Sequence, residues 1–206
     1  MIRELWDARV LPHLVERACR SRVILAERRR WIPEASGHVL EVGVSSGLNL
    51  AFYDPARVIE LHGIDLSPPM LAVAGTRAAE LAIPIQLALG DAEALAFDRA
   101  RFDSVVMTYT LCSVRDPRCT LAEIHRVLRP GGRLILVEHG RAPDARTQRW
   151  QRWLTPAWSR VGGNCHLDRD VVPSLEAAGF SVADVHSAYT EGASWLAYTS
   201  AGIARP

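Results

Sequence analysis

The sequence predicts an α/β protein built on an open, mostly parallel sheet, and three observations support this. In Val39–Phe52, VLEVGVSSGLNLAF, a β-branched run ends at Glu41, a loop of small residues follows, and an apolar, helix-compatible segment resumes. Strand-like runs then alternate along the chain with segments of helical periodicity. Acidic residues end or follow the first three runs, at Glu41, Asp65 and Asp91. Because parallel strands present their carboxyl ends at one edge of a sheet, we expect these carboxylates to lie along one edge.

The loop after Glu41 is typical of a site for a nucleotide-like ligand. Its glycines permit tight backbone angles and close approach of a ligand, and amides at the start of a helix favour polar or anionic groups. Asp65 follows Gly47 by 18 residues, near the spacing at which an acidic residue meets a ribose hydroxyl. The dinucleotide pattern G-x-G-x-x-G would need glycine at Leu48, so the register argues against a nicotinamide cofactor.

The order of residues in this loop resembles motif I, E/D-x-G-x-G-x-G, of the class I S-adenosylmethionine-dependent methyltransferases. The matching positions are Glu41, Gly43, Ser45 and Gly47. Four further segments continue the resemblance in family order: Gly63–Ser67, Gly90–Glu93, Phe102–Val106 and Leu128–Gly132. The resemblance implies a Rossmann-like, seven-stranded, mostly parallel sheet with an antiparallel last strand and helices on both faces.

The same resemblance implies S-adenosylmethionine as cofactor and assigns its contacts. Asp65 would bind the ribose hydroxyls and Asp91 the adenine amine. The alternative for Asp91 is that it merely caps a turn. The cofactor-binding residues expected in this way are Glu41, Gly43, Ser45, Gly47, Asp65, Leu66, Asp91, Ala92, Thr108 and Tyr109. Ser45 departs from the family's glycine, which predicts a tighter turn or weaker cofactor binding.

Length and composition describe one domain, residues 1–206, with 49% hydrophobic residues. A net charge of +1 gives no case for a nucleic-acid partner. All 24 basic residues are arginines, so Schiff-base chemistry and a catalytic Tyr-x-x-x-Lys pair lack their lysine. The four cysteines show neither a C-x-x-C pair nor zinc spacing, so we expect reduced thiols and no metal. The chain shows no signal peptide and no stretch apolar enough to span a bilayer, which favours a cytoplasmic location.

The first 36 residues predict a helical cover. Leu5–Trp31 has apolar residues at helical spacing, with arginines crowding the rest of its surface. We expect it to pack over the sheet edge or the cofactor cleft. A basic amphipathic helix also binds anionic membranes, so peripheral contact with the inner membrane face stays open.

The remaining elements follow in order. Strands are expected at Val58–Ile64, Ile85–Leu89, Phe102–Thr108, Arg133–Val137, Phe180–Ser187 and Trp195–Ala204, and helices at Pro69–Leu81, Pro117–Leu128 and Val171–Ala178. Pro68 suits the first turn of its helix and Gly179 a helix end. Arg129–Gly132 predicts the turn into the fifth strand.

Residues 143–170 are expected to form the acceptor pocket, because they follow the fifth strand and carry three tryptophans and a glycine pair. His139, at the end of that strand, is either a proton acceptor near neutral pH or a structural histidine. Cys112 is expected in the core. The segments 109–114, 138–139 and 163–169 resemble a group of small bacterial methyltransferases similar to the membrane-associated thiol S-methyltransferases of animals.

The sequence therefore predicts in-line methyl transfer from S-adenosylmethionine to a small-molecule nucleophile, with a thiol as the first choice. The catalytic hypothesis is that His139, Cys165 and His166 line the acceptor site and that a histidine takes the thiol proton. Two alternatives stay open. One is a phospholipid amine N-methyltransferase docked by the basic helix, and the other is a non-catalytic cofactor-binding module, suggested by Ser45. Oligomeric state is not predicted.

Overall fold

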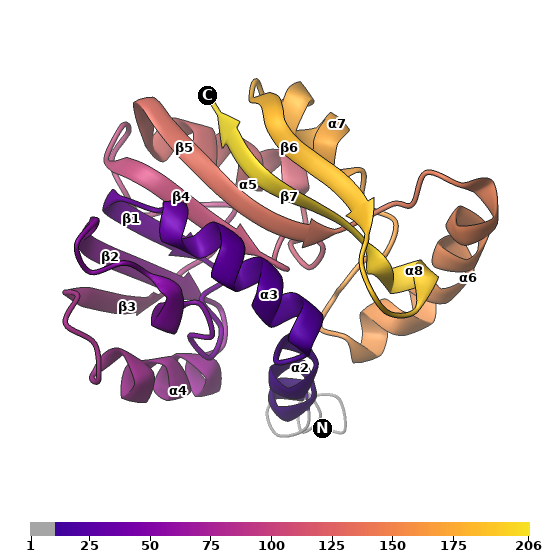
Figure 1. Ribbon diagram of the computed structural model, residues 1–206, viewed down its shortest axis with the longest axis horizontal. Helices are drawn as coiled ribbons and strands as arrows, with labels where there is room; N and C mark the ends of the chain where they lie inside the picture. Colours follow the sequence, from indigo (N-terminus) through magenta and orange to yellow (C-terminus); the bar gives the residue numbers. More distant parts are fainter. Residues whose placement is uncertain (1–10) are drawn as a thin grey trace.

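A computed structural model describes residues 11–206, without the side chains of residues 12 and 13. The described residues form one seven-stranded sheet in the order β3-β2-β1-β4-β5-β7-β6 (Figure 1). Its strands are β1 (Gly37–Val42), β2 (Val58–Asp65), β3 (Ile85–Leu89), β4 (Phe102–Thr108), β5 (Leu128–His139), β6 (Ser181–Tyr189) and β7 (Tyr198–Arg205). Pairing is parallel throughout except that β7 runs antiparallel to both β5 and β6. The predicted fold class is confirmed.

Helices cover both faces of this sheet (Figure 1). They are α2 (Leu11–Cys19), α3 (Arg22–Trp31), α4 (Pro68–Ala78), α5 (Pro117–Val127), α6 (Ala145–Val161), α7 (Val171–Ala177) and α8 (Ser194–Ala197), with short 3₁₀ turns η2 (Ile32–Glu34) and η3 (Leu50–Phe52). Because successive strand residues point to opposite faces, β4 places Val105 and Met107 in the core that contains α5 and α7. Val106 instead joins the opposite core, which contains Ile32 and Leu50. Burial on both faces explains why the central strands are almost continuously apolar.

Helix ends are set by local side chains. Pro68 is in the first turn of α4 as predicted, after Ser67. Asp116 caps α5 by accepting the amides of Arg118 at 2.8 Å and Cys119 at 3.4 Å. Gly179, at φ +91°, follows the end of α7 and confirms the predicted stop.

The helix predicted after the glycine loop is wrong. Leu48–Phe52 forms turns and η3, with i to i−3 hydrogen bonds from Leu50 to Gly47 and from Phe52 to Asn49. Only a few residues separate the loop from Asp54-Pro55. Pro55 disfavours helical backbone angles at the residue before it, so a helix has no room to extend. No helix N-terminus therefore faces a ligand at this loop.

Other boundaries also differ from the prediction, and three of them change the arrangement of elements. The N-terminal helix is interrupted near Ser21, which separates α2 from α3, and residues 5–10 of the expected helix lie outside the described residues. β5 begins at Leu128, because Leu128 pairs with Phe102 before a register shift around Gly131, which has φ +77°. The last strand begins only at Tyr198, since α8 takes up the preceding turn.

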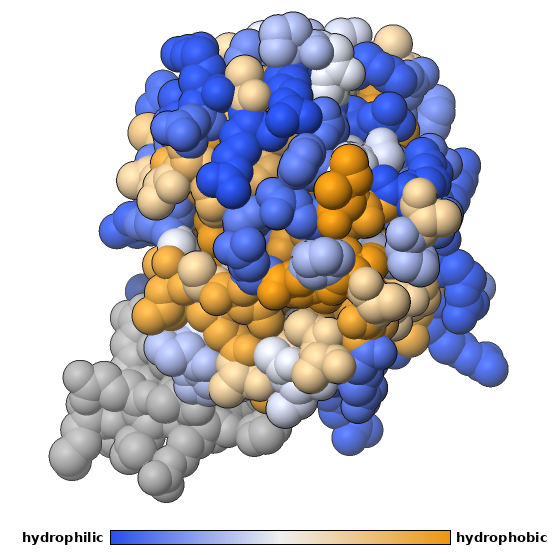
Figure 2. Space-filling model, turned by 90° about the vertical axis from the view of Figure 1, so that its left-hand side faces the viewer, coloured by the Kyte–Doolittle hydropathy of each residue, from blue (hydrophilic) through white to orange (hydrophobic). Residues whose placement is uncertain are grey.

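Strands β2 and β3, the residue after β2, and α4 carry most of the exposed large apolar residues outside the N-terminal and α6 regions. Figure 2 views this side of the molecule and shows apolar surface between charged side chains. The residues are Ile59, Leu66, Val73 and Leu89.

Among the described helices, none combines the length and the apolar character needed to cross a membrane.

Candidate active site

A cavity of about 1210 Å³ lies at the carboxyl ends of the strands. Val42, Thr108 and His139, which end β1, β4 and β5, line it together with Ile64 of β2. This is the switch point of the sheet, where β1 and β4 are neighbours and the connections leave in opposite directions. Residues of α2 and α3 line the opposite wall. The volume exceeds the roughly 300 to 1,000 Å³ typical of a single small-ligand pocket, so a cofactor and an acceptor both fit.

The glycine loop brings the backbone to the cavity wall. Gly43, at φ +73°, lies so close to Thr110 that a Cβ would be 2.3 Å from its Oγ1, so only glycine fits. Ser45 stands where the family pattern has glycine. Its backbone is in the left-handed region, at φ +49°, which non-glycine residues rarely adopt. Gly47 does not line the cavity; its Cβ would press on Leu50 and Ala74. Its role in the structure is to allow close packing beneath the loop.

Asp65 is held in place by the loop that it faces. Its Oδ2 accepts the amide of Ser45 at 2.8 Å and its Oδ1 the amide of Ser67 at 2.8 Å. Burial raises the pKa of this carboxyl, while the backbone amides work in the opposite direction. Each oxygen keeps a further lone pair, and Asp65 lines the cavity, so the predicted contact with ribose hydroxyls is sterically available. Leu66, next to it, is on the rim and 69% exposed.

Asp91 caps a turn and also lines the cavity, while its predicted contact with the adenine amine stays a prediction. Its Oδ1 accepts the amide of Glu93 at 3.0 Å, which caps the turn, and it lines the cavity with Ala92. Its Oδ2 is paired with Arg115 at 2.6 Å. The Arg115 side chain is 72% exposed and also contacts Glu93, with Nε 3.4 Å from Oε1, so this ion pair lies at the surface and contributes little to stability.

Glu41 does not reach the cavity but anchors a buried polar network behind it. Its carboxylate accepts Asn49 Nδ2 at 2.9 Å and the Tyr53 hydroxyl at 2.8 Å. Arg28 of α3 donates to Asn49 Oδ1 and, at 2.8 Å, to Thr108 Oγ1. Burial raises the pKa of Glu41 to about 7, although Tyr53 and the Arg28 charge oppose the shift. The network ties the N-terminal helix to the carboxyl ends of β1 and β4.

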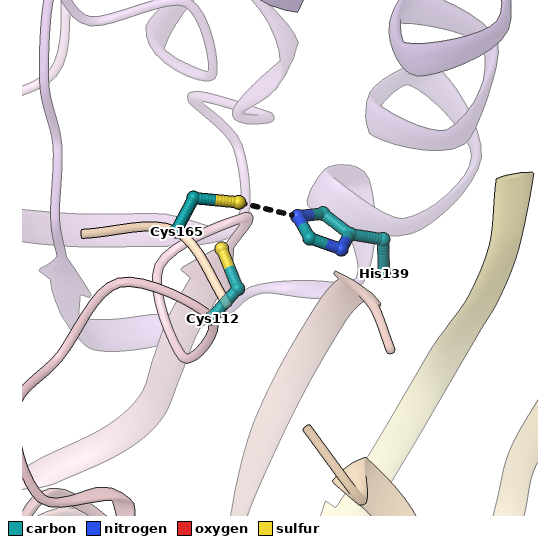
Figure 3. A group of neighbouring side chains, drawn as sticks. All are labelled: Cys112, His139 and Cys165. Carbon is teal, nitrogen blue, oxygen red and sulfur yellow. Dashed lines mark hydrogen bonds between the residues drawn. The ribbon is translucent and has the colours of Figure 1, made fainter. Parts of the chain in front are cut away.

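Near the carboxyl ends of β4 and β5, three side chains converge at the cavity wall (Figure 3). Cys112 follows β4, His139 ends β5 and Cys165 follows α6, and their ligand atoms all lie within 4.8 Å of one another. Cys165 Sγ is 3.1 Å from His139 Nε2. All three are at least nine-tenths buried. His139 Nδ1 is also buried and has no hydrogen-bond partner among the described residues.

The cluster is electrostatically coupled. A hydrogen bond from Cys112 lowers the pKa of Cys165, and the same contact raises the pKa of Cys112. Burial disfavours the His139 imidazolium, but Cys112 and Glu138 beside it raise its pKa overall. Glu138 is buried, which raises its pKa to about 7, and its Oε1 accepts the amides of Thr110 at 2.6 Å and Leu111 at 2.8 Å. Glu138 therefore holds the loop that carries Cys112.

The other predicted site residues divide between the cavity and its surroundings. Tyr109 lines the cavity, and its ring stacks near that of His139, with centroids 6.1 Å apart. His166 is half-buried and is not among the residues that line the cavity, although its amide donates to the Cys112 carbonyl at 2.8 Å. His139 and Cys165 do line the cavity, and the catalytic roles of all three residues stay predictions.

Sequence reasoning missed Arg28, Asn49 and the participation of Cys112. Arg28 looked like one of many surface arginines, and no local pattern distinguishes it. Cys112 is 27 residues from His139 and 53 from Cys165, so spacing gives no signal for a cluster.

An open parallel sheet with a glycine loop, a ribose-facing carboxylate and a cavity at the switch point defines a Rossmann-like enzyme for a nucleoside cofactor. Residues 40–136 match the family model described as methyltransferase domain. The chain is 33% identical over 152 residues to demethylmenaquinone methyltransferase of Thermus thermophilus, which covers 71% of this chain and 69% of that protein. The chain belongs to the class I S-adenosylmethionine-dependent methyltransferases.

Other relatives extend the comparison. Rat thiol S-methyltransferase TMT1B is 36% identical over 149 residues, which cover 69% of this chain and 59% of the relative. Phosphatidylethanolamine N-methyltransferase of Cereibacter sphaeroides is 38% identical over 105 residues, 50% of this chain and 51% of that protein. The solved S-adenosylmethionine-dependent methyltransferase of Mesorhizobium loti has the same fold, with a TM-score of 0.66 and 21% identity. The match covers 87% of this chain and 95% of that chain. The match thus spans about 60% of the length of the thiol S-methyltransferase.

The residues present fit the family's cofactor. Gly43 and Ser45 bring backbone to the cavity wall, Asp65 lines the cavity with further lone pairs, and Ala92 and Ile64 supply an apolar wall for a base. S-Adenosylmethionine, the cofactor of this family, would occupy this end of the cavity, which leaves the end at His139 for an acceptor.

Proposed function

We propose that this protein transfers the methyl group of S-adenosylmethionine to a small-molecule thiol. The observation that carries the proposal is the buried cluster of Cys112, His139 and Cys165 at the acceptor end of the cavity. The name of the rat relative agrees with a thiol acceptor. When bound, the cofactor supplies a methyl group on a sulfonium, which is already a good leaving group.

The chain then has three tasks: to orient the two reactants, to exclude water and to help the acceptor lose its proton. A thiol reacts as its thiolate. His139 is placed to take that proton, because it lies on the cavity wall and Glu138 next to it favours the imidazolium. Trp158 and Leu196, which also line this end, make an apolar wall for the rest of the acceptor.

The direct test measures products. The purified chain is incubated with S-adenosylmethionine and either 2-mercaptoethanol or thiophenol, and S-adenosylhomocysteine and the methyl thioether are quantified by mass spectrometry. We expect His139→Gln to lower turnover by about 100-fold, within the range for loss of a general base. His186→Gln is the matched control, because His186 is exposed on β6 and outside the cavity. Equal turnover of both variants would contradict the role of His139.

A phospholipid amine acceptor is the second candidate, and it is favoured by a surface feature as well as by the bacterial relative. Trp150 and Trp153 on α6 are 51% and 70% exposed and lie beside the exposed Arg149 and Arg152. Aromatic and basic side chains together suit a membrane interface. Vesicles with phosphatidylethanolamine, assayed in parallel with the thiols, separate the candidates: methylation of the lipid amine without methylation of either thiol would overturn the thiol proposal.

A further inference from the structure

We propose that Cys112, His139 and Cys165 bind a zinc ion whose fourth coordination position takes the sulfur of the acceptor thiol. The second half of this proposal rests on the proposed thiol methylation, whereas the metal site does not. Zinc spacing was not evident in the sequence, and the fold alone brings the three residues together.

The geometry is close to that of a zinc site. Zinc binds sulfur at about 2.3 Å and imidazole nitrogen at about 2.0 to 2.1 Å, so tetrahedral ligands lie roughly 3.6 to 3.8 Å apart. Cys165 Sγ and His139 Nε2 are 3.1 Å apart, and all three ligand atoms lie within 4.8 Å of one another. Figure 3 shows the side chains converging from three separate segments. Changes of up to about 1 Å in the distances between pairs of ligand atoms place all three ligands around one ion.

The donor set favours zinc over hard cations. Two sulfurs and one imidazole suit a borderline-soft ion, and two thiolates balance the charge of Zn²⁺. Three protein ligands with one open position are characteristic of catalytic rather than structural zinc. The described residues supply no fourth ligand to this group, and all three ligands line the cavity. The open position is therefore directed to where the acceptor would lie.

The surroundings of the cluster are those of a metal site shielded from water. Cys112 and Cys165 pack in one apolar cluster with Leu167, Leu154 and Trp158. The Cys112 segment is held by the amide of His166 at 2.8 Å, so the ligands are carried on fixed backbone. A low dielectric strengthens the attraction between a cation and thiolates.

Coordination would supply the thiolate that the reaction needs. On binding zinc the acceptor thiol releases its proton to solvent, because a coordinating thiol is deprotonated. The electron pair of the acceptor sulfur then forms the bond to the methyl carbon. The carbon–sulfonium bond breaks, and its pair stays on the departing sulfur. The methylated product is a neutral thioether, a weaker ligand, and so it is released. In this scheme coordination to zinc replaces the proton transfer to His139 described under the proposed function, and His139 acts as a ligand through Nε2.

The test measures the metal before it measures activity. The full chain is purified with a phosphine reductant and without chelators. The number of zinc ions per chain is then determined by inductively coupled plasma mass spectrometry. Zinc is then removed and replaced by Co²⁺, whose thiolate charge-transfer and tetrahedral d–d absorption report the ligands. We expect close to one zinc per chain and an affinity at least about 100-fold weaker in Cys112→Ser or Cys165→Ser. Cys119→Ser, which alters an exposed cysteine outside the cluster, keeps full affinity.

The outcomes are distinct. Failure of the reduced wild type to bind zinc overturns the site, as does equal zinc affinity of Cys112→Ser and Cys119→Ser. Should one serine variant not fold, the other and His139→Gln give the same comparison. Addition of 2-mercaptoethanol shifts the d–d bands if the fourth position is open, and unchanged bands overturn thiol coordination. Metal binding with shifted bands but no methyl thioether leaves the metal site standing and refutes the proposed function alone.

Discussion

Glu138 provides the sharpest test of the electrostatics at the acceptor end. It is fully buried, one oxygen accepts two backbone amides, and the other oxygen has no partner among the described residues. Burial raises its pKa from 4.5 to about 7. Glu138→Gln keeps an oxygen for the amides of Thr110 and Leu111 and removes the ionisable group.

The direction in which pH changes the free energy of unfolding follows from the difference in the pKa of Glu138 between the folded and the unfolded chain. Below pH 4.5 the carboxyl is protonated in both the folded and the unfolded chain and contributes nothing to the pH dependence. As pH rises, the unfolded chain loses this proton first, so the free energy of unfolding of the wild type falls until the pH passes about 7. Between pH 5 and pH 8 the loss from this one group is about 2.5 kcal/mol.

Urea denaturation followed by tryptophan fluorescence at pH 5, 6, 7 and 8 measures this difference. We expect Glu138→Gln to be less stable than wild type at pH 5, because its amide nitrogen is unsatisfied, and to gain about 2.5 kcal/mol relative to wild type by pH 8. Glu80→Gln, at an exposed position after α4, is the control and should follow the wild type at every pH. Parallel stability curves for Glu138→Gln and wild type would show that the carboxyl is not desolvated and would refute the reasoning.

Three further predictions test the cofactor end and the buried polar network behind it. Asp65→Ala should weaken S-adenosylmethionine binding about 10- to 100-fold in calorimetric titration, because hydrogen bonds to a charged acceptor are lost; unchanged affinity would remove Asp65 from the cofactor site. Ser45→Gly should raise the free energy of unfolding by about 1 kcal/mol without weakening cofactor binding, since φ +49° strains a serine; no gain in urea denaturation would argue against that strain. Arg28→Met should cost about 3 to 5 kcal/mol in thermal unfolding, because Glu41 and Asn49 lose their buried cation. Glu41→Gln in the Arg28→Met background should recover part of that loss, and an unchanged loss would contradict the coupling.

The strand positions and the cofactor end were predictable because their signals are local. A β-branched run, a glycine loop and an acidic residue at the end of the next run are each read within a few residues, and parallel pairing then brings Gly43, Asp65 and Asp91 to one edge of the sheet. The helix after the loop was the local failure. There Ser45, Gly47 and the nearby Pro55 limited the segment to turns and η3.

At the acceptor end the sequence predicted that His139 and Cys165 are site residues, but their meeting with Cys112 in one cluster was decided by the tertiary structure. Cys112, His139 and Cys165 come from the ends of β4, β5 and α6, and they meet only because β5 lies beside β4 and the segment after α6 folds back over both. Arg28 likewise becomes a buried partner of Asn49 and Thr108 only once α3 packs across the sheet. Sequence spacing carries information about neighbours within one element, whereas these contacts depend on the order of strands and the packing of helices, which no local pattern encodes.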